Sequence, residues 1–474
     1  MSKSELAKYI SSPDEDIYSV SGLPEEVVAV IFAYVSRSPL SFKENIAKVL
    51  EEEQHGRERA GKFHEKWVLN YGHASVAEHA SVHLGVERVS RLFSSVLELC
   101  GEHLSFTEYS QRYQRPRRGD FVIPPEIEGD GDLAKEFARV CGVQYDIYEQ
   151  LNAVLFDFLK RGNGGGQTDA ALEKIAFEDA RYALGLAYMT NLGMTANARA
   201  VEDCLSKLLS SPYGEARARA EDMKREARFS VPTLVKYASE NPCLVASRKA
   251  AAESAQEFTG GGGEAAPPAP HVRLLDAPDE ADALRRVAAA LLYGSASAGA
   301  QSLAGMTAEQ AEGIFAAAIS GLGKHDNPPD ALKLVAYRAE FTISEACWHQ
   351  LLRHRKAEWF PKDPSVSFGV TVPPNIRAAG GVAEELLLTA ARESEALFER
   401  LTKAGRPLAA HYAVTNAHNR RVLGCFSLWE LYHLINLRMS EGAQWDIKET
   451  VRALAEEAGK VHPVLTAPAM KRVC

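Results

Sequence analysis

Three short clusters of polar residues have the types and spacing needed to bind an anionic nucleotide. In the first, Thr107–Tyr113, the residues Glu108, Ser110 and Arg112 alternate with others. In an extended segment, side chains two apart point to the same side of the chain. A hydroxyl and a guanidinium on one side would bind phosphate, because arginine makes bidentate contacts to phosphate oxygens. The alternative is a solvated Glu–Arg pair, which contributes less than ~1 kcal/mol.

The second cluster is Gln350-Leu-Leu-Arg353-His354-Arg355, at the end of a helical pattern over residues 341–352. Cations at a helix C-terminus interact favourably with the helix dipole, which by itself would account for them. The same charges would also bind the phosphates or the ring of an anionic cofactor. Spacing alone leaves both interpretations open.

The third cluster is Asn436-Leu437-Arg438, followed by Gln444-Trp445-Asp446. It lies near the predicted end of another helix, so helix termination and an ordinary core tryptophan are the alternative to a binding role.

Two other kinds of site, a phosphate loop and a metal site, find little support in the sequence. The glycines 260–263 are followed by Glu and Pro and not by the Lys-Ser/Thr of a phosphate loop. His73 and His79 are six residues apart without an evident third ligand, so no metal site is expected.

The composition favours a multidomain globular protein. Its 474 residues correspond to two to four domains. The net charge of −9 argues against a nucleic-acid-binding chain, and the arginines near Pro116 are expected to form an exposed loop. No apolar run of about 18 residues is present to span a membrane, and no apolar signal segment begins the chain, so we expect a cytoplasmic protein. Seven scattered cysteines without a Cys-x-x-Cys pair are expected to be mostly small buried residues.

The chain divides at residues 258–270, where four glycines precede a proline-rich stretch typical of a linker. We therefore expect one domain over 1–257 and a second over 271–474. The two parts are weakly similar, since residues 121–127 (FVIPPEI) correspond to 370–376 (VTVPPNI). The offset between them falls from 249 at the Pro-Pro pairs to about 230 further on. A chance similarity of two helical domains is the alternative to an internal duplication.

Hydrophobic periodicity indicates mostly helices, with a few short strands. The helical patterns are 86–100, 133–159 and 171–209 in the first half, and 341–352, 382–403 and 408–437 in the second. The candidate strands are 121–123, 272–275 and 370–372. Pro24-Glu25-Glu26 is typical of a helix start, and Thr307-Ala-Glu-Gln310 resembles a capping box.

Taken in order, these segments resemble the flavin-dependent thymidylate synthases. That family has a His-x-Ser/Thr-x-x-Glu-His segment, a helix ending in Gln-x-x-Arg-His-Arg, and a Glu-x-Ser-x-Arg-Tyr segment. Asn-x-Arg and Asn-Leu-Arg-x-x-x-x-Ala-Gln-Trp follow. The resemblance covers roughly residues 17–257 and 271–465, and it implies an α+β fold of two tandem domains of this kind, each helix-rich with a small sheet.

The two halves keep different motifs. The first has the segment 73–79 (HASVAEH), Glu108-x-Ser110-x-Arg112, Arg181 and Asn197-Ala-Arg199, but it has residues 99–103 (LCGEH) in place of Arg-His-Arg. The second keeps Arg353-His354-Arg355 and the Asn436-Leu437-Arg438 segment, but residues 360–367 (FPKDPSVS) replace Glu-x-Ser-x-Arg. His411 stands where the first half has Arg181, and Ser427 and Trp429 stand in the places of Asn197 and Arg199.

The family is homotetrameric and builds each active site from neighbouring subunits. The resemblance therefore implies a fused dimer with one composite nucleotide site per chain, and a homodimer that corresponds to the family's tetramer. The opposite pairing of motifs would give inactive sites. The implied substrate-binding residues are Glu108, Ser110, Arg112, Arg181, Gln350, Arg353 and Arg438.

The family reaction makes dTMP from dUMP with methylenetetrahydrofolate as carbon donor, bound FAD and NADPH as reductant, and it needs no cysteine nucleophile. By resemblance, Arg353, Arg438 and Arg181 would be catalytic because their charge stabilises negative charge on the pyrimidine. The implied FAD-binding residues are His73, Glu78, Asn197, Arg199, Arg353, His354, Arg355 and His433, the last at a position where the family usually has Asn. Two alternatives are flavin-dependent C5 modification of another pyrimidine nucleotide and a pseudoenzyme that binds nucleotide or flavin.

Overall fold

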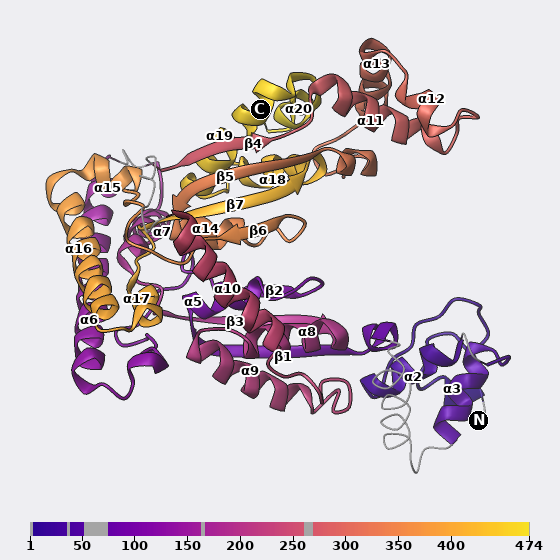
Figure 1. Cartoon of the computed structure of the whole chain (residues 1–474), viewed down its shortest axis with the longest axis horizontal. Helices are drawn as coiled ribbons and strands as arrows, with labels where there is room; N and C mark the ends of the chain where they lie inside the picture. The colour runs from indigo at the N-terminus through magenta and orange to yellow at the C-terminus, as the bar shows by residue number, and fades with distance from the viewer. Residues whose placement is uncertain (1–2, 36–37, 52–73, 163–165, 260–268, 474) are drawn as a thin grey trace. The chain divides into compact units, whose positions relative to one another are not determined.

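The computed structural model describes residues 3–35, 38–51, 74–162, 166–259 and 269–473 (Figure 1). His73 and most of the predicted linker, residues 260–268, lie outside the described residues. The described chain forms two compact units. Unit 1 contains the described residues up to Ser110, then Pro124–Glu126, then those from Tyr188 to Thr259. Unit 2 contains Gln111–Ile123, Ile127–Ala187 and the described residues from Ala269 onward, so it combines segments of both sequence halves.

Unit 1 is built around a three-stranded antiparallel sheet of order β1-β3-β2. The burial of β3 alternates strictly from residue to residue, as expected for a sheet with one buried and one open face. Near the N-terminus, α2 and α3 bury a small separate core that includes Val27, Ile31 and Ile46. The elements are α1 (Lys3–Leu6), α2 (Glu25–Val35), α3 (Phe42–Glu51), η3 (Ala74–His79), β1 (Ser81–Ser90), α5 (Arg91–Glu98), β2 (Ser105–Glu108), β3 (Met189–Asn197), α8 (Ala198–Leu209), α9 (Gly214–Ala227) and α10 (Pro242–Thr259).

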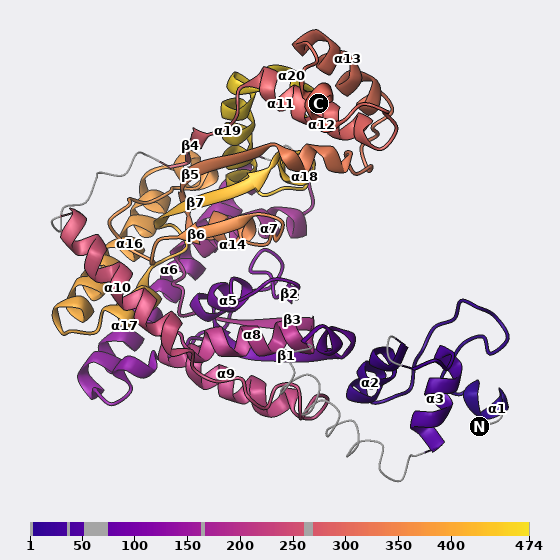
Figure 2. The ribbon, with the colours of Figure 1, turned by 45° about the vertical axis from the view of Figure 1, so that its right-hand side comes forward.

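Unit 2 has a four-stranded antiparallel sheet of order β4-β5-β7-β6. Its core joins the sheet to the helices that follow β5 and β7, with Phe341, Trp348 and Tyr432 fully buried. The strands and first helices are β4 (His271–Asp276), α11 (Glu280–Tyr293), α12 (Ala300–Ala304), α13 (Ala308–Ile319), η6 (Asp330–Leu334), β5 (Ala336–Ser344), α14 (Glu345–Leu351), β6 (Glu358–Pro361) and β7 (Asn419–Ser427). The C-terminal helices are α18 (Leu428–Arg438), α19 (Trp445–Val461) and α20 (Pro463–Lys471). In Figure 2, α11, α12 and α13 gather near the C-terminus.

A helical layer in unit 2 pairs segments from the two sequence halves. The long helices α6 (Gly131–Gly162) and α16 (Gly381–Lys403) lie side by side (Figures 1 and 2). Gln144 of α6 donates to the Ser394 hydroxyl of α16 over 2.7 Å. The remaining elements of the layer are α7 (Asp169–Ala180), η5 (Arg181–Ala183), α15 (Pro374–Ala379) and α17 (Pro407–Ala413), and η4 (Pro125–Ile127) precedes α6.

The strands β1, β3 and β2 are repeated by β5, β7 and β6 in the same order. The register of β1 and β5 matches at their C-terminal ends, and an irregularity between Val86 and Val89 shifts the rest of β1 by one residue. Ser90 lies opposite Met189 in unit 1, and Ser344 lies opposite Asn419 in unit 2. The helix after each of these strands starts in the same way, because the hydroxyls of Ser90 and Ser344 cap α5 and α14. The order of paired strands is therefore alike in the two units, with β4 an additional strand in unit 2. The internal duplication itself stays a prediction.

Several predicted helices were wrong in part. The patterns over 86–100 and 341–352 begin in the strands β1 and β5, and helices start only at Arg91 and Glu345. The patterns over 171–209 and 408–437 contain β3 and β7, the strands that pair on both edges. Such strands are decided by hydrogen bonds to distant segments, which override a local helical pattern.

Two predicted strands were also wrong, while other local predictions were confirmed. Residues 121–123 and 370–372 form no strand, and each segment contributes isolated backbone bonds such as Val122 N–H to Ala187 O and Thr371 N–H to Ala417 O. The strand predicted over 272–275 is β4, the helix predicted from Pro24 is α2, and Thr307 forms the expected capping box with Gln310. Among the described cysteines, four are buried: Cys100, Cys141, Cys204 and Cys347.

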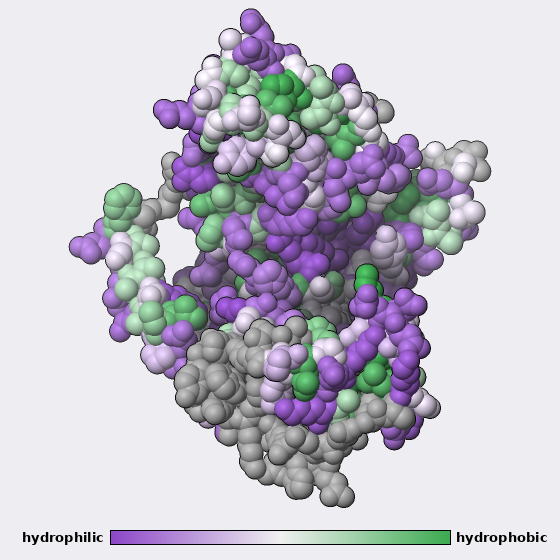
Figure 3. Space-filling view, turned by 90° about the vertical axis from the view of Figure 1, so that its right-hand side faces the viewer, coloured by the Kyte–Doolittle hydropathy of each residue, from purple (hydrophilic) through white to green (hydrophobic). Residues whose placement is uncertain are grey.

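The surface carries both hydrophilic and hydrophobic side chains (Figure 3). Figure 3 shows one face, on which hydrophilic residues surround small separate hydrophobic patches. Exposed large apolar side chains include Tyr293 and Phe360. No helix within the described ranges has both the length and the apolar character needed to cross a lipid bilayer.

Candidate functional site in the second unit

Three arginines from the two sequence halves lie close together in unit 2. Arg438, the last residue of α18, has its pKa lowered to about 10, first by burial and then by the positive charges of Arg353 and Arg112. Arg112 donates from Nη2 to the carbonyl oxygen of Gly442 over 3.4 Å, and Gly442 lies in the turn after α18. Like charges gathered at a partly buried place are unfavourable unless an anion neutralises them. The arrangement is suited to binding an anionic ligand.

The guanidinium of Arg438 is held by two acceptors. Its Nε donates to Nε2 of His354 over 2.8 Å, and its Nη2 donates to the backbone oxygen of Gln350 over 3.0 Å. Both acceptors belong to the Gln350–Arg355 cluster at the end of α14. The sequence motif therefore orients Arg438 as well as supplying its own charges.

Arg112 and Arg181 are both oriented by Glu178 of α7. Arg112 Nε donates to the Glu178 carboxylate over 3.1 Å, and Arg181 Nε donates to its backbone oxygen over 3.1 Å. Arg181 is 3% exposed, and its buried Nη2 has no hydrogen-bond partner among the described residues. That nitrogen is a donor that a ligand could use.

A buried hydrogen-bond chain fixes the side chain of Gln350. Gln350 Nε2 donates to Gln444 Oε1 over 3.0 Å, and Gln444 Nε2 donates to the Tyr182 hydroxyl over 3.1 Å. The Tyr182 hydroxyl in turn donates to Asp446 over 2.7 Å. Gln444 also caps α19 through its side-chain oxygen. The chain joins η5 of the first sequence half to α14 and α19 of the second.

Asp179 at the end of α7 accepts two hydrogen bonds from the second half. Trp445 Nε1 and Asn375 Nδ2 each donate to one of its carboxylate oxygens over 2.8 Å. Burial raises the pKa of Asp179 to about 6, against the effect of both donors. Trp445 also stacks on Tyr182, with ring centroids 5.6 Å apart. The tryptophan of the third sequence cluster thus joins segments from both halves.

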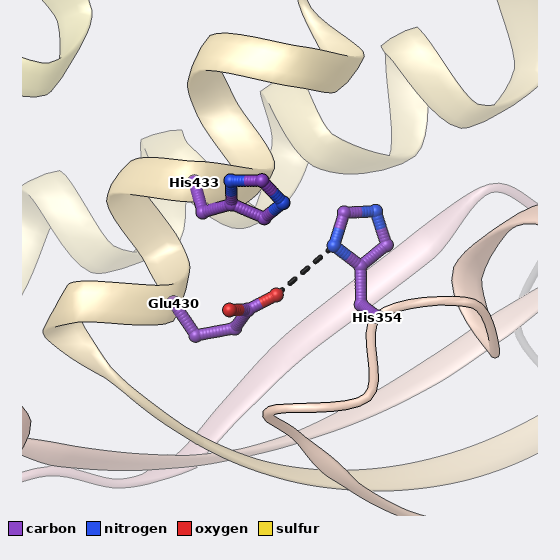
Figure 4. Close-up of side chains that lie close together, drawn as sticks. All are labelled: His354, Glu430 and His433. Atoms are coloured by element: carbon purple, nitrogen blue, oxygen red, sulfur yellow. Dashed lines mark hydrogen bonds and ion pairs between the residues drawn. The ribbon is translucent and has the colours of Figure 1, made fainter. Parts of the chain in front are cut away.

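His354, Glu430 and His433 form a compact group (Figure 4). Arg438 contacts this group through His354. Their candidate metal-ligating atoms lie within 4.8 Å of one another. His354 Nδ1 is 3.0 Å from Glu430 Oε1, while its Nε2 accepts from Arg438. Burial and the charge of Arg438 lower the pKa of His354 to about 3, so its ring is neutral and carries its one proton on Nδ1. His354 then has no lone pair left for a metal ion.

The residues around this group are suited to an anionic aromatic ligand. Arg353, Arg355 and His433 are exposed, and the His433 ring stacks beside Trp429 with centroids 6.2 Å apart. Lys356 lies over the Trp429 ring at 3.7 Å. Cationic groups next to aromatic faces fit a cofactor that has both phosphates and a flat ring.

The remaining predicted residues within the described ranges belong to unit 1, where they have protein partners: Glu78, Glu108, Ser110, Asn197 and Arg199. Glu78 pairs with Arg199 over 2.5 Å, and Asn197 caps α8 by accepting from Ala200 N–H. The Glu108 carboxylate is buried 3.7 Å from Arg91.

The strand β2 ends at Glu108, and a turn follows at residues 111–113. The alternation argument therefore does not extend from Glu108 and Ser110 to Arg112, which belongs to unit 2.

Sequence reasoning missed three residues of this site: Glu178, Tyr182 and Glu430. Each had a weak local signal. Glu178 lies one helical turn before Arg181, Tyr182 follows it directly, and Glu430 is the third residue of α18. None of these signals reveals which distant side chain the residue contacts.

Comparison with known proteins identifies the family. A family model described as thymidylate synthase complementing protein (Thy1) matches residues 19–233 and 273–464. The chain belongs to this family of flavin-dependent thymidylate synthases. The family and the helix-rich α+β fold expected from the motifs are thus confirmed.

Individual Thy1 relatives match either one part or nearly all of the chain. The flavin-dependent thymidylate synthase of Clostridium tetani is 31% identical over 215 residues, covering 45% of this chain and 82% of that protein. UPF0159 protein Ta1429 of Thermoplasma acidophilum is 26% identical over 471 residues, covering 91% of this chain and 93% of that protein. A crystal structure of thymidylate synthase X from Helicobacter pylori with FAD and dUMP is 16% identical, with a TM-score of 0.34, and covers 43% of this chain and 99% of that one.

Proposed function

We propose that this protein methylates dUMP to dTMP, with FAD as cofactor, methylenetetrahydrofolate as carbon donor and NADPH as reductant. The observation that carries the proposal is the group of Arg112, Arg353 and Arg438, which two sequence halves contribute to one unit. A single pyrimidine nucleotide offers both a phosphate and a ring that becomes negatively charged during substitution at C5. The arginine group would serve both needs.

In this proposal Arg112 binds the phosphate, and Arg438, Arg353 and Arg181 face the pyrimidine. Arg438 is already oriented by His354 and Gln350, so little reorganisation is needed when charge develops on the ring. The free Nη2 of Arg181 is a further donor to a ring oxygen. Glu108 and Ser110 belong to unit 1, and their contribution to nucleotide binding stays a prediction from the sequence.

The Cys347 thiol, which interacts electrostatically with Arg438 and Arg181, is unsuited to attack on the ring. Cys347 is fully buried, and burial together with Asp446 raises its pKa well above the usual range despite the charges of Arg438 and Arg181. A thiol that stays protonated is a poor nucleophile. This supports chemistry in which no cysteine is joined to the pyrimidine.

FAD would be held by His354, Arg353, Arg355 and His433, whose charges and rings fit its phosphates and isoalloxazine. When bound, FAD supplies the electron transfer between NADPH and the one-carbon unit. The protein's own groups bind and orient: Arg353 and Arg355 neutralise phosphate charge, and the neutral His354 ring holds Arg438 in place. A contribution of His73, Glu78, Asn197 and Arg199 to FAD binding stays a prediction from the sequence.

We also propose that the functional molecule is a homodimer, because the family model matches two segments of each chain, as expected for a fused pair of family domains. Two chains would then supply the four domains of the family's tetramer.

The absorbance spectrum of the purified protein tests the proposal. The protein should bind FAD and appear yellow, and NADPH should bleach the flavin band at a rate that dUMP changes. A colourless protein that takes up no added FAD would exclude it. Growth of a thymidine auxotroph on expression of this chain distinguishes dUMP methylation from modification of another pyrimidine nucleotide. FAD binding without any turnover would instead indicate a pseudoenzyme.

A further inference from the structure

Glu430 occupies the third position of α18, where an acid commonly bonds back to the helix cap. Its backbone N–H donates to the capping hydroxyl of Ser427, as in a capping box. The carboxylate instead contacts the His354 ring over 3.0 Å (Figure 4). Glu430 is 1% exposed, and its second oxygen, Oε2, has no hydrogen-bond partner among the described residues. Burying a carboxyl group with one oxygen unpartnered is energetically unfavourable, which indicates that its contact with His354 has a function.

The hydrogen bonds on the two sides of His354 depend on each other. Arginine can only donate, so the bond from Arg438 Nε requires a lone pair on His354 Nε2. A neutral imidazole then carries its proton on Nδ1, and that proton needs an acceptor. Glu430 Oε1 is this acceptor, and it can accept whether or not Oε2 carries a proton. Without it, the Nε2–H tautomer becomes competitive, and its N–H would oppose the N–H of Arg438.

We propose that Glu430 is a positioning residue for Arg438, which acts by holding His354 in the Nδ1–H tautomer. The catalytic and binding roles of Arg438 rest on the proposed function above. Glu430 itself touches no reacting atom, and its effect reaches the substrate only through the His354 ring.

The two copies within the chain support a joint role for the three residues. The cap residues Asn197 and Ser427 align α8 with α18, which places Ala200 opposite Glu430 and Leu208 opposite Arg438. In the first copy, residues 99–103 stand in place of Arg353-His354-Arg355. The acid is therefore present in the copy that has the histidine and the arginine, and absent from the copy that lacks both.

The test compares Glu430→Leu, Glu430→Gln and the matched variant Glu345→Gln in the full-length protein, by dUMP affinity and thermal unfolding. Glu430→Leu should weaken dUMP binding about tenfold or more, the range for misplacing one charged hydrogen-bond donor. Glu430→Gln keeps an acceptor oxygen and should stay within about threefold of wild type. Glu345→Gln alters another buried carboxylate of unit 2, bonded to Arg420 over 2.8 Å, and should affect stability without affecting dUMP affinity.

A double-mutant cycle separates positioning from a general loss of stability. In a His354→Gln background, the amide oxygen can accept from Arg438 without any tautomer control. Adding Glu430→Leu there should cost much less affinity than it does in wild type. An equal loss in both backgrounds would overturn the proposal, and so would a Glu430→Gln variant as poor as Glu430→Leu.

A crystal structure of Glu430→Leu gives a readout that does not depend on dUMP. The expected result is that Arg438 Nε no longer lies within hydrogen-bond distance of His354 Nε2. An unchanged contact overturns the positioning role. If instead wild type fails to bind dUMP while this contact is lost in the variant, the proposed function fails and the positioning role stands.

Discussion

Gly185 and Thr415 form an isolated antiparallel bridge in unit 2, and they take equivalent places when the chain around β3 is aligned with the chain around β7. The flanking hydrogen bonds obey the same relation. Leu186 N–H donates to Val414 O over 2.8 Å, and its counterpart Asn416 N–H donates to Leu184 O over 2.8 Å. Such reciprocal contacts are the mark of an isologous, two-fold interface. This reciprocity is expected if the two halves of the chain are copies of one domain.

Larger side chains at Gly185 should destabilise this contact. A Cβ there would lie 2.8 Å from Gln144 Oε1, and Gln144 is fixed by its bond to Ser394. We expect Gly185→Val to lower the free energy of unfolding by about 1–3 kcal/mol, through overpacking. Gly313→Ala in α13, where a Cβ meets nothing within 4 Å, is the matched control and should stabilise by about 0.5–1 kcal/mol. Equal unfolding midpoints for the two variants would contradict a tight contact at Gly185.

Separating the halves of the chain should abolish nucleotide binding by the second half alone. A fragment of residues 269–474 lacks Arg112, Glu178 and Arg181, and it loses the packing of α6 against α16. We expect no measurable dUMP binding by calorimetry, and recovery of binding when the fragment is co-expressed with residues 1–259. Full dUMP affinity in the isolated fragment would show that the site is not composite.

Arginines from both halves should be needed for substrate binding. Arg112→Ala and Arg353→Ala should each weaken dUMP binding about 10- to 100-fold, because a hydrogen bond to a charged group contributes about 1.5–3 kcal/mol. Ser365→Ala and Glu102→Ala change residues at the corresponding places of the opposite copies and should leave the dUMP affinity as it is. Binding that is lost in only one of the two arginine variants would assign the site to a single half.

The pH dependence of stability should reveal the buried pair of Glu430 and His354. Burial raises the pKa of Glu430 from 4.5 to about 7, so its contribution to stability falls as pH rises from 4.5 to 7. The pKa of His354 is lowered from 6.5 to about 3, so its contribution falls as pH drops below 6.5. The two effects oppose each other between pH 4.5 and 6.5.

Glu430→Gln removes the first effect and leaves the second. The free energy of unfolding of the variant minus that of wild type should therefore be more favourable to the variant at pH 8 than at pH 5. The change in this difference should be on the order of 2 kcal/mol, measured by urea unfolding at both pH values. A difference between variant and wild type that is the same at both pH values would mean that the Glu430 pKa is not raised in the folded protein.

The sequence determined the features that depend on local chemistry. The starts of α2 and α13, the long apolar stripes of α6 and α16, and the strand after the linker all follow from short-range patterns. The order of the motifs, with Arg112 and Arg181 in one half and Gln350, Arg353 and Arg438 in the other, was sufficient to indicate the family and an anionic ligand.

Only the tertiary structure decided how these pieces meet. The strands β3 and β7 lie within helical patterns, and they form because β1, β2, β5 and β6 supply hydrogen-bond partners from far along the chain. Arg112 joins the second unit because a turn follows β2, which alternation in an extended segment would not predict. His354 contacts Arg438, which lies 84 residues further along the chain, and Glu430, which lies 76 residues further along. Local patterns specify where helices begin and which faces are apolar, whereas the partner of a buried polar group is set by packing between distant segments.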